Sequence, residues 1–553
     1  MQTSNLKQTG AATGAANRAP QAATHFDAIV IGAGFGGLRV LHEMRRLGLS
    51  TRVFEAGDDV GGVWYWNRYP GARTDSEAWA YCYSFSKELE DEWVWPERMP
   101  TWDQVLAYLR HVADRFDLRR EIQFGTRITS AHYNESTGLW EVRSEKGESF
   151  TARFFISATG LLTVPIDPPF PGLESFKGEV YKSCRWPHHK VEFAGKRVAM
   201  IGSGSTAVQI LPMVAHTAKQ ATLFQRTPNY VLPGRNHPLD DNQRAGLKAN
   251  REAIWDEVRS QVFAFPMPAA GRTFHATPPE QRHAIFEAGW EDGGFRFVFT
   301  TFDDLLVDAE ANAAAAEFLR GKIRSIVKDP KLAELLCPKY SFGLKRPPLG
   351  NFYYETFNRP NVRVVDLSNN PIECITPNGV KTGGKEYEFD MLIFAIGFDA
   401  MTGSLTQMDI RGKGGQSIKN RWEAGPRTNL GITVDGFPNF FMISGPHSPF
   451  ANIPPIIEGT VDWIGRAIEQ VQAQGKKSIE PTAPAVEQWG HHIQELLDAT
   501  LLGAGIEVNS WYLGANVPGK AHSVLFYFGG AGAYFKELHE SFEQRFPGFV
   551  FAG

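Results

Sequence analysis

The sequence predicts an α/β protein with two Rossmann-like dinucleotide-binding domains and a helical insertion in the second domain. Three observations lead to this prediction. A strand, a glycine loop, a helix and a second strand follow one another from Phe26, the same pattern returns from Lys196, and residues 237–340 read as amphipathic and aromatic. Because 553 residues are too many for one compact core, we expect several domains.

The composition is that of a well-packed globular protein, with 42% hydrophobic and 12% aromatic residues. A net charge of −4 gives no reason to expect nucleic acid or an anionic membrane as a partner. No apolar run reaches the roughly 18 residues of a membrane helix. The 4 cysteines form no CxxC pair, which argues against a disulfide framework, a metal site or a dithiol centre and favours a cytoplasmic location. Residues 1–24 are expected to be a disordered tail, with a transit peptide as the alternative.

The first pattern, "FDAIVIGAGFGGLRVLHEMRRLGLSTRVFEAG", predicts a dinucleotide site. Gly32, Gly34 and Gly37 allow a tight turn, and the helix N-terminus that follows would face a pyrophosphate. Glu55, at the end of the second strand, would accept hydrogen bonds from a ribose diol. A purely structural turn is the alternative, but the order of strand, glycines, helix and acid favours a nucleotide.

The second pattern, "KRVAMIGSGSTAVQILPMVAHTAKQATLFQRTP", has Gly202, Gly204 and Ala207 in the glycine positions. Its second strand ends in Arg226, which follows Gly202 by 24 residues as Glu55 follows Gly32 by 23. An arginine there would bind a ribose 2′-phosphate that a carboxylate would repel. We therefore expect NADPH at the second site and FAD, the usual hydride acceptor, at the first.

Two strand-to-loop joints, "ARFFISATG" and "FDMLIFAIGFDA", divide the chain. The expected FAD domain comprises residues 25–160 and 391–553, and the expected NADPH domain comprises 161–236 and 341–390 around the insertion 237–340. The aromatic side chains of the insertion either line a substrate cavity or pack the insertion itself, and the sequence leaves both open.

The stretch "GGVWYWNRYPGARTD" follows the first site closely enough to line its cleft. The absence of a cysteine pair excludes a disulfide reductase and leaves electron-transfer reductases and monooxygenases. The stretch resembles the long motif of the Baeyer–Villiger monooxygenases at every fixed position, namely Gly61, Gly62, Trp64, Tyr69, Pro70, Gly71 and Asp75. The resemblance runs from about residue 26 to the C-terminus and includes "FQRTP", "FGLKR", "AIGFDA" and "WYLGANVPGK", as in phenylacetone and cyclohexanone monooxygenases.

The resemblance implies an FAD- and NADPH-dependent enzyme that uses O2 to convert ketones into lactones or esters through a C4a-peroxyflavin anion and a tetrahedral Criegee adduct. It assigns catalysis to Arg346, a permanent cation that would stabilise these anions, and to Asp75, which would orient Arg346. It also implies three further groups of cofactor contacts. Those around the flavin and nicotinamide are Val63, Trp64, Tyr65, Trp66, Arg73, Thr74 and Tyr81. Those around the pyrophosphate and 2′-phosphate are Ser205, Thr206, Gln209, Arg226, Thr227 and Lys345, and Trp511 is expected to contact NADP.

One position departs from the family. Its second motif, FxGxxxHxxxWP, is present as "FKGEVYKSCRWP" with Lys182 at the histidine, which puts the coupling of oxygen use to product formation in doubt. The segment Ser444 to Pro455 resembles members that act on cyclic ketones, so we expect cyclic or bulky ketones as substrates. A flavin monooxygenase acting on nitrogen or sulfur and an uncoupled NADPH oxidase remain as alternatives.

Overall fold

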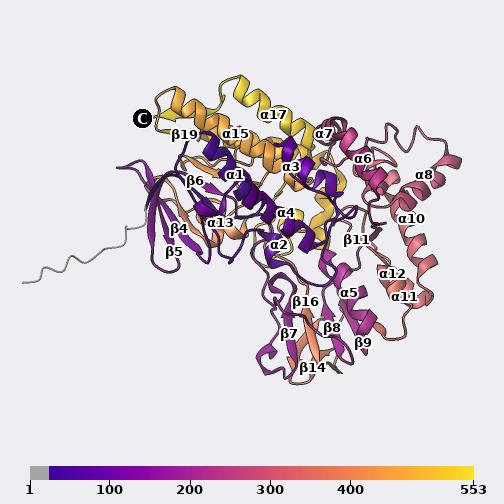
Figure 1. Cartoon of the computed structure of the whole chain (residues 1–553). Helices are drawn as coiled ribbons and strands as arrows, with labels where there is room; N and C mark the ends of the chain where they lie inside the picture. Colours follow the sequence, from indigo (N-terminus) through magenta and orange to yellow (C-terminus); the bar gives the residue numbers. More distant parts are fainter. Residues whose placement is uncertain (1–23) are drawn as a thin grey trace, which may run out of the picture.

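Two large β-sheets organise the part of the chain that the structure describes (Figure 1). This computed structural model describes residues 24–553, so the predicted tail of residues 1–24 lies outside it apart from Thr24. The first sheet contains β1 (His25–Ile31), β2 (Thr51–Phe54), β3 (Ile122–Gln123), β4 (Ile128–Asn134), β5 (Leu139–Ser144), β6 (Ser149–Ser157), β17 (Asp409–Arg411) and β18 (Phe440–Met442).

The strands of the first sheet follow the order β17-β4-β5-β6-β1-β2-β3, and β18 pairs with β6. Strands β1, β2, β3, β6 and β18 are parallel, whereas β4 and β5 form an antiparallel extension. Alternate residues of β1 face opposite cores: Ala28 and Val30 pack on one side, Ile29 and Ile31 on the other. Both faces of this sheet are therefore covered, as parallel strands require.

Helices cover one face of the first sheet, with α15 packed along α1 (Figure 1). The apolar length of α15 explains this position, since most of its residues are buried. The helices of this part are α1 (Phe35–Arg46), α2 (Val63–Trp66), α3 (Lys87–Glu92), α4 (Trp102–Arg115), α13 (Gly403–Gln407), α14 (Ile418–Arg421), α15 (Ile453–Ala473), α16 (Ala483–Asp498) and α17 (Ala531–Glu543). Strands β19 (Ser478–Pro481) and β20 (Phe549–Ala552) pair near the C-terminus.

The second sheet is parallel throughout, with the order β12-β9-β8-β16-β7. Its strands are β7 (Glu179–Lys182), β8 (Arg197–Ile201), β9 (Gln220–Gln225), β12 (Val362–Asp366) and β16 (Met391–Phe394), and its helices are α5 (Ser205–Thr217) and α12 (Tyr353–Thr356). A three-stranded antiparallel sheet, β13 (Ile372–Thr376), β14 (Gly379–Thr382) and β15 (Lys385–Glu388), lies between β12 and β16 in sequence. The fold is thus α/β with two Rossmann-like units, as predicted.

Strand pairing differs from the predicted division of the chain at one place. The expected boundary between residues 390 and 391 would assign Met391–Phe394 to the FAD domain. These residues form β16, which pairs with β7 and β8 inside the second sheet. The chain therefore leaves the second sheet only after Phe394, because the apolar run that looked like a link is itself a buried central strand. The other predicted boundaries remain predictions.

Helices α6–α11 all fall inside the predicted insertion of residues 237–340. Their bounds are α6 (Asp241–Ala249), α7 (Arg251–Ser260), α8 (Pro279–Asp292), α9 (Arg296–Phe299), α10 (Ala309–Ile326) and α11 (Pro330–Leu336). Outside this range on either side, β10 (Leu232–Pro233) pairs with β11 (Leu349–Gly350). A core rich in phenylalanine, which includes Phe286, Phe297 and Phe302, holds α8, α9 and α10 together, whereas α7 packs on the first core and α11 on the second.

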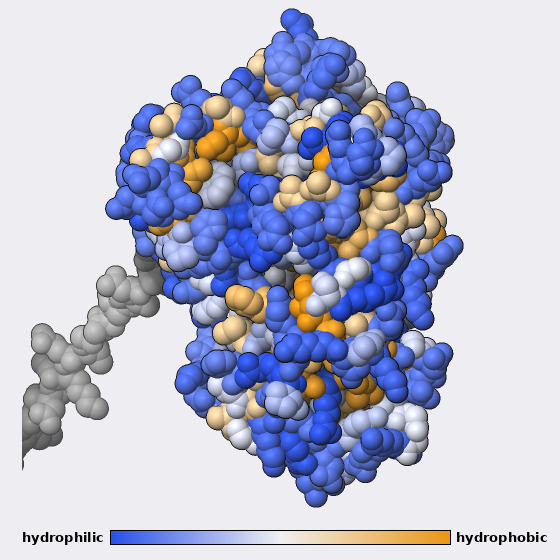
Figure 2. All heavy atoms as spheres, turned by 90° about the vertical axis from the view of Figure 1, so that its right-hand side faces the viewer, coloured by the Kyte–Doolittle hydropathy of each residue, from blue (hydrophilic) through white to orange (hydrophobic). Residues whose placement is uncertain are grey.

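Hydrophilic residues cover most of the face shown in Figure 2, and apolar residues appear there only in separate patches. Between residues 24 and 553, no helix combines the length and the apolar character that crossing a bilayer requires. In the same range, no group of three or more His, Cys, Asp or Glu side chains is placed to hold a metal ion. The cytoplasmic location and the absence of nucleic-acid and membrane partners stay predictions.

Candidate active site

A cavity of about 1110 Å³ lies where the two glycine loops meet. Gly32 and Gly202 follow β1 and β8 directly and have φ angles of +102° and +115°, which glycine adopts readily. A Cβ atom at Gly32 would lie 2.6 Å from the carbonyl oxygen of Ala158, and one at Gly202 would lie 2.3 Å from that of Ala395. Both loops therefore pass close to the backbone that follows a neighbouring strand, β6 in the first sheet and β16 in the second. This is the carboxyl end of the parallel strands, where open α/β sheets bind ligands.

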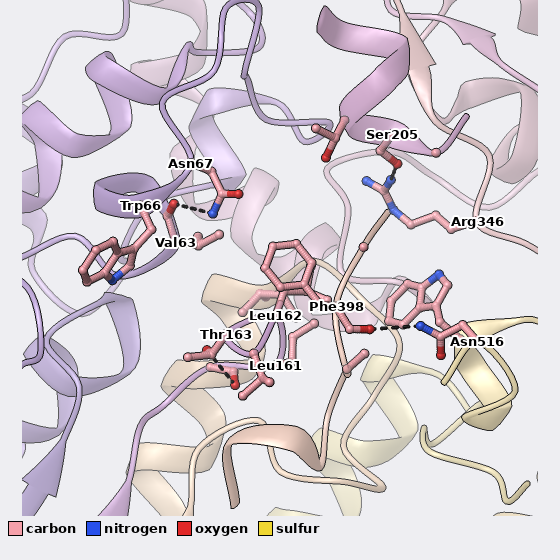
Figure 3. A pocket seen from close by; sticks show the side chains of 18 of the residues that line it. Val63, Trp66, Asn67, Leu161, Leu162, Thr163, Ser205, Arg346, Phe398 and Asn516 are labelled. Atoms are coloured by element: carbon pink, nitrogen blue, oxygen red, sulfur yellow. Dashed lines mark hydrogen bonds between the residues drawn. The ribbon is translucent and has the colours of Figure 1, made fainter. Parts of the chain in front are cut away.

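Arg346 lies between the two units (Figure 3). Its guanidinium forms an ion pair with Asp75 and donates through Nη1 to the hydroxyl of Ser205 at 3.2 Å. Asp75 is 8% exposed, and its second oxygen, Oδ1, is buried without a partner. Since Ser205 begins helix α5, one side chain joins the stretch after the first loop to the helix after the second. The two predicted catalytic residues are thus in direct contact although they are 271 positions apart.

The stretch from Gly61 to Asp75 is a bridge between the two sheets. Gly61 and Gly62 have φ angles of +133° and +55° and allow the turn that starts the short helix α2. Tyr69 is buried, and its hydroxyl donates to Oε1 of Gln209 on α5 at 3.0 Å. Burial raises the pKa of Tyr69 to about 12, so this hydroxyl keeps its proton and remains a donor.

Glu55 has the geometry of a ribose-binding acid. It follows β2, is 5% exposed, and accepts backbone N–H bonds from Ala33 at 2.8 Å and from Gly57 at 2.7 Å. Burial raises its pKa, while these N–H groups oppose the rise. The carboxylate therefore fixes the first glycine loop at the place where an adenosine ribose would lie.

Two cations face the cavity beside the second loop. Arg226 follows β9, and Lys345 lies near it in the cavity wall. Burial and, to a smaller extent, the charge of Arg226 lower the pKa of Lys345 to about 8. Within residues 24–553, no carboxylate lies within ion-pair distance of either cation. A doubly charged 2′-phosphate would supply the counter-charge that these two neighbouring cations lack.

Comparisons with known proteins agree with this geometry. The model of the flavin-binding monooxygenase-like family matches residues 27–238. A Baeyer–Villiger monooxygenase of Pseudooceanicola batsensis is 44% identical over 553 residues, covering 100% of this chain and 98% of the relative. A phenazine N-monooxygenase of Lysobacter antibioticus is 43% identical over 530 residues, covering 95% of this chain and 97% of the relative.

Two solved structures share the whole architecture. A cyclohexanone monooxygenase from Rhodococcus sp. Phi1, bound to NADP+, has a TM-score of 0.93 at 42% identity, covering 96% of this chain and 100% of the other. An oxidized steroid monooxygenase bound to NADP has a TM-score of 0.91 at 44% identity with the same coverage. This chain belongs to the Baeyer–Villiger monooxygenase family. The predicted family, the enzyme class and the FAD and NADPH cofactors are thereby confirmed.

Most of the site residues predicted for this family member line the cavity, but three do not. Gly37 packs against the first loop, where a Cβ atom would lie 1.8 Å from the carbonyl oxygen of Gly32. Ala207 is fully buried in the second core, and Tyr65 packs beside the rings of Trp66 and His188. These three therefore shape the cofactor loops instead of facing a cofactor. The contacts of the other predicted residues with FAD and NADPH remain proposals.

Other lining residues of this family member were missed because they lie in loops without a distinctive pattern. Figure 3 shows Leu161 and Leu162, which follow the first joint, and Asn516, whose amide donates to the carbonyl of Phe398 at 2.9 Å. Phe263 and Phe299 of the insertion stack at 4.7 Å and also face the cavity. The strand-to-loop joints could have indicated Leu161 and Phe398, since ligands bind where parallel strands end.

Lys182, at the position of the family's motif histidine, lies at the end of edge strand β7 and pairs with Asp167 at 2.5 Å. Its side chain is 38% exposed and does not line the cavity. This placement agrees with a structural position and gives the residue no direct part in proton transfer at the site. The same motif supplies Arg185, which lies over the ring of Trp66 at 4.5 Å and so connects the second unit to the first.

Proposed function

We propose that this protein converts ketones, and cyclic or bulky ketones in particular, into lactones or esters with NADPH and O2. The contact of Arg346 with Asp75, in a cavity shared by both glycine loops, is the observation that carries the proposal. A permanent cation at that place suits an oxidation in which negative charge develops on the reacting oxygens. It has no evident use in an oxidation by a neutral, electrophilic oxidant.

The residues present fit both cofactors. In the first unit, a Cβ atom at Gly34 would lie 3.2 Å from the Cα of Gly62, so a side chain there would force apart two segments that line the cavity. In the second unit, Arg226 and Lys345 offer charge that no carboxylate of residues 24–553 neutralises. When bound, NADPH supplies the hydride and FAD supplies the activation of O2.

The chain's own residues then have separate tasks. A guanidinium is a permanent cation, so Arg346 can stabilise an oxyanion without donating a proton to it. Asp75 holds one side of the guanidinium, and Ser205 accepts from another N–H of the same group. Trp64 and Tyr69 are each 8% exposed and limit the access of water to this corner. A preorganised cation in a water-poor site is the arrangement that lowers the barrier of such a step.

The wall around the remaining space is apolar and aromatic. Phe263 and Phe299 come from the insertion, Phe450 from the segment Ser444–Pro455, and Trp511 and Phe526 from the C-terminal loop. Phe450 packs edge-on against Trp511 at 5.9 Å and against Phe526 at 5.2 Å. Such walls bind apolar ketones with little orientation by hydrogen bonds, and relatives named for cyclohexanone and steroids are consistent with rings of different sizes.

Product analysis tests the proposal. Purified holoenzyme with NADPH and air would be given cyclic, aryl and steroid ketones, and products would be separated and identified by mass. We expect lactones or esters from the wild type. Arg346→Ala should retain FAD and be reduced by NADPH but form no ester, because the guanidinium acts after flavin reduction. Normal ester formation by Arg346→Ala would contradict the assigned role.

Oxidation of nitrogen is the second candidate function, because the phenazine N-monooxygenase of Lysobacter antibioticus is 43% identical to this chain. The same assay should therefore include a tertiary amine, an aromatic nitrogen heterocycle and a sulfide. N-oxide or sulfoxide without any ester would favour this candidate. Hydrogen peroxide with every compound would instead indicate an uncoupled NADPH oxidase.

A further inference from the structure

A group of three charges, of which Glu77 and Arg98 are buried and Arg296 is partly exposed, joins the stretch after Asp75 to the helical insertion. Glu77 is 1% exposed, and its Oε1 accepts from Nη2 of Arg98 at 3.0 Å and from Nη1 of Arg296 at 2.7 Å. Oε2 of Glu77 is buried without a partner. Arg98 is 5% exposed, and burial lowers its pKa although Glu77 opposes this effect. None of these three side chains lines the cavity.

This ion triad, Glu77 with Arg98 and Arg296, contacts the turn between helices α8 and α9. Nη1 of Arg98 donates to the carbonyl of Asp292 at 3.1 Å and so satisfies the C-terminal end of α8. Gly294 has a φ of +63°, and a Cβ atom there would lie 2.8 Å from Nη2 of Arg98. The turn thus leaves just enough room for the guanidinium of Arg98 to reach Glu77. Arg296, the first residue of α9, binds Glu77 as well and so attaches the start of this helix to it.

The residue that precedes helix α9 places an aromatic ring against the catalytic arginine. The ring of Phe295, directly before Arg296, has its centroid 5.5 Å from Cζ of Arg346, within cation–π range. Phe295 is 6% exposed and is supported edge-on by Phe265 at 5.2 Å. Asp75 and Ser205 hold the polar edge of the guanidinium, so the ring covers a face that they leave free.

The geometry points to Glu77, Arg98 and Arg296 as positioning residues that hold Phe295 over Arg346 and keep the guanidinium on Asp75. This inference rests on the proposed function of Arg346. Stability alone is a poor reason for such a group, because the cost of desolvating buried charges about equals their attraction. A fixed ring beside the arginine also excludes water from the place where charge develops.

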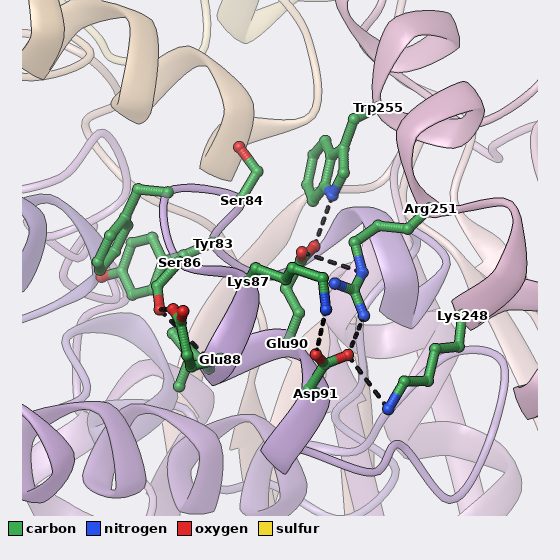
Figure 4. A network of polar contacts seen from close by, with 12 residues as sticks. Tyr83, Ser84, Ser86, Lys87, Glu88, Glu90, Asp91, Lys248, Arg251 and Trp255 are labelled. Atoms are coloured by element: carbon green, nitrogen blue, oxygen red, sulfur yellow. Dashed lines mark hydrogen bonds and ion pairs between the residues drawn. The ribbon is translucent and has the colours of Figure 1, made fainter.

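A second ionic contact between the insertion and the first unit provides a matched control (Figure 4). On α7, Arg251 contacts Asp91 and lies 3.2 Å from Glu90 of α3, and Trp255 donates to Glu90 at 2.6 Å. Lys248 of α6 lies 3.2 Å from Asp91. This contact also anchors an insertion helix by arginine, but none of its members lines the cavity or touches Phe295. Arg251→Met should therefore loosen α7 without changing the chemistry.

The decisive variant is Arg296→Met, which leaves the Glu77–Arg98 pair intact. We expect wild-type FAD content and wild-type anaerobic flavin reduction by NADPH. Ester formed per NADPH should fall about fivefold, with hydrogen peroxide accounting for the difference, because the cation–π contact is lost. Amide exchange of residues 293–300 should become faster. Arg296→Lys should restore most of the coupling, and Arg251→Met should accelerate exchange only in residues 251–260.

Phe295→Leu tests the same inference without touching an ion. It should lower ester formed per NADPH by a similar factor, and the double variant with Arg296→Met should be no worse than either single variant. Wild-type coupling in Arg296→Met or in Phe295→Leu would overturn the inference, as would equal losses in Arg296→Met and Arg251→Met. If the wild type itself forms no ester from any ketone, the proposed function fails instead.

Discussion

The two glycine loops are equally tight at their first glycine but leave different amounts of room at the second and third glycine positions. In the first loop, a Cβ atom at Gly34 would lie 3.2 Å from Gly62, and one at Gly37 would lie 1.8 Å from the carbonyl of Gly32. In the second loop, a Cβ atom at Gly204 would have no neighbour within 4 Å. Ala207 already carries a methyl group at the position that matches Gly37.

The residues that follow β2 and β9, the second strand of each unit, also differ in exposure. Glu55 is 5% exposed and bonded to two backbone N–H groups, whereas Arg226 is exposed and has no carboxylate partner among residues 24–553. A closed, preorganised site retains its ligand, and an open site with free charge exchanges it. We infer that this difference separates a resident FAD from an NADPH that is renewed at each turnover.

Among the variants that test this difference between the two units, Gly37→Ala should have the largest effect, on the amount of bound FAD. A methyl group cannot lie 1.8 Å from a carbonyl oxygen, so the helix and the loop must separate at a cost of about 3 kcal/mol or more. We expect loss of nearly all bound flavin, measured as flavin absorbance per protein. The control Gly204→Ala should keep full FAD and an unchanged melting temperature. Full flavin in Gly37→Ala would show that the first loop is not tight.

Arg226→Ala should have the second largest effect, on the binding of NADPH. Removing charge-assisted bonds to a 2′-phosphate costs about 2 kcal/mol, so the KM for NADPH should rise about 30-fold. The KM for NADH should change less than about threefold, since NADH has no phosphate there. Steady-state kinetics with both coenzymes measure this, with Arg363→Ala, an exposed cation of β12, as the control. Equal changes for both coenzymes would remove the assignment.

Glu55→Gln should affect the first unit alone and more weakly. Glutamine has one acceptor oxygen, so either the N–H of Ala33 or that of Gly57 loses its partner. We expect FAD to dissociate about tenfold faster, about 1.4 kcal/mol, with an unchanged KM for NADPH. Dissociation is followed by flavin fluorescence after dilution. An unchanged rate would mean that Glu55 does not support the cofactor loop.

The smallest expected effect is a pH dependence of the second unit. Burial and Arg226 lower the pKa of Lys345 to about 8, so the free enzyme loses this charge as the pH rises through 8. Below pH 8 the ammonium binds the 2′-phosphate, and above it kcat/KM for NADPH should decline about threefold more than that for NADH. Lys345→Arg should remove the extra decline, because guanidinium keeps its proton. Parallel profiles for both coenzymes would contradict this.

Much of the fold could be predicted because its signals are local. The glycine loops, the strands before them and the residues at positions 55 and 226 fall where the patterns place them. The aromatic residues of the insertion could not be sorted in the same way. Phe263 and Phe299 stack at the cavity wall, whereas Phe286 and Phe297 stack in the core of the insertion. The sequence around them carries no signal that separates the two groups, and only packing distinguishes their roles.

Likewise, Met391–Phe394 reads as an apolar strand, but nothing local says which of two parallel sheets it joins. The pair Arg346 and Asp75 was predicted only through a family motif, since no periodicity connects residues so far apart.

The sequence by itself determined the two dinucleotide units and predicted different riboses for them, because tight turns, helix starts and the charge at one strand end depend on neighbouring residues. Only the tertiary structure decided that Asp75, Ser205 and Arg346 meet, that Phe295 covers the arginine, and that Glu77 holds the turn behind it. These contacts join segments of both sheets and the insertion, and their distances are set by how those parts pack together.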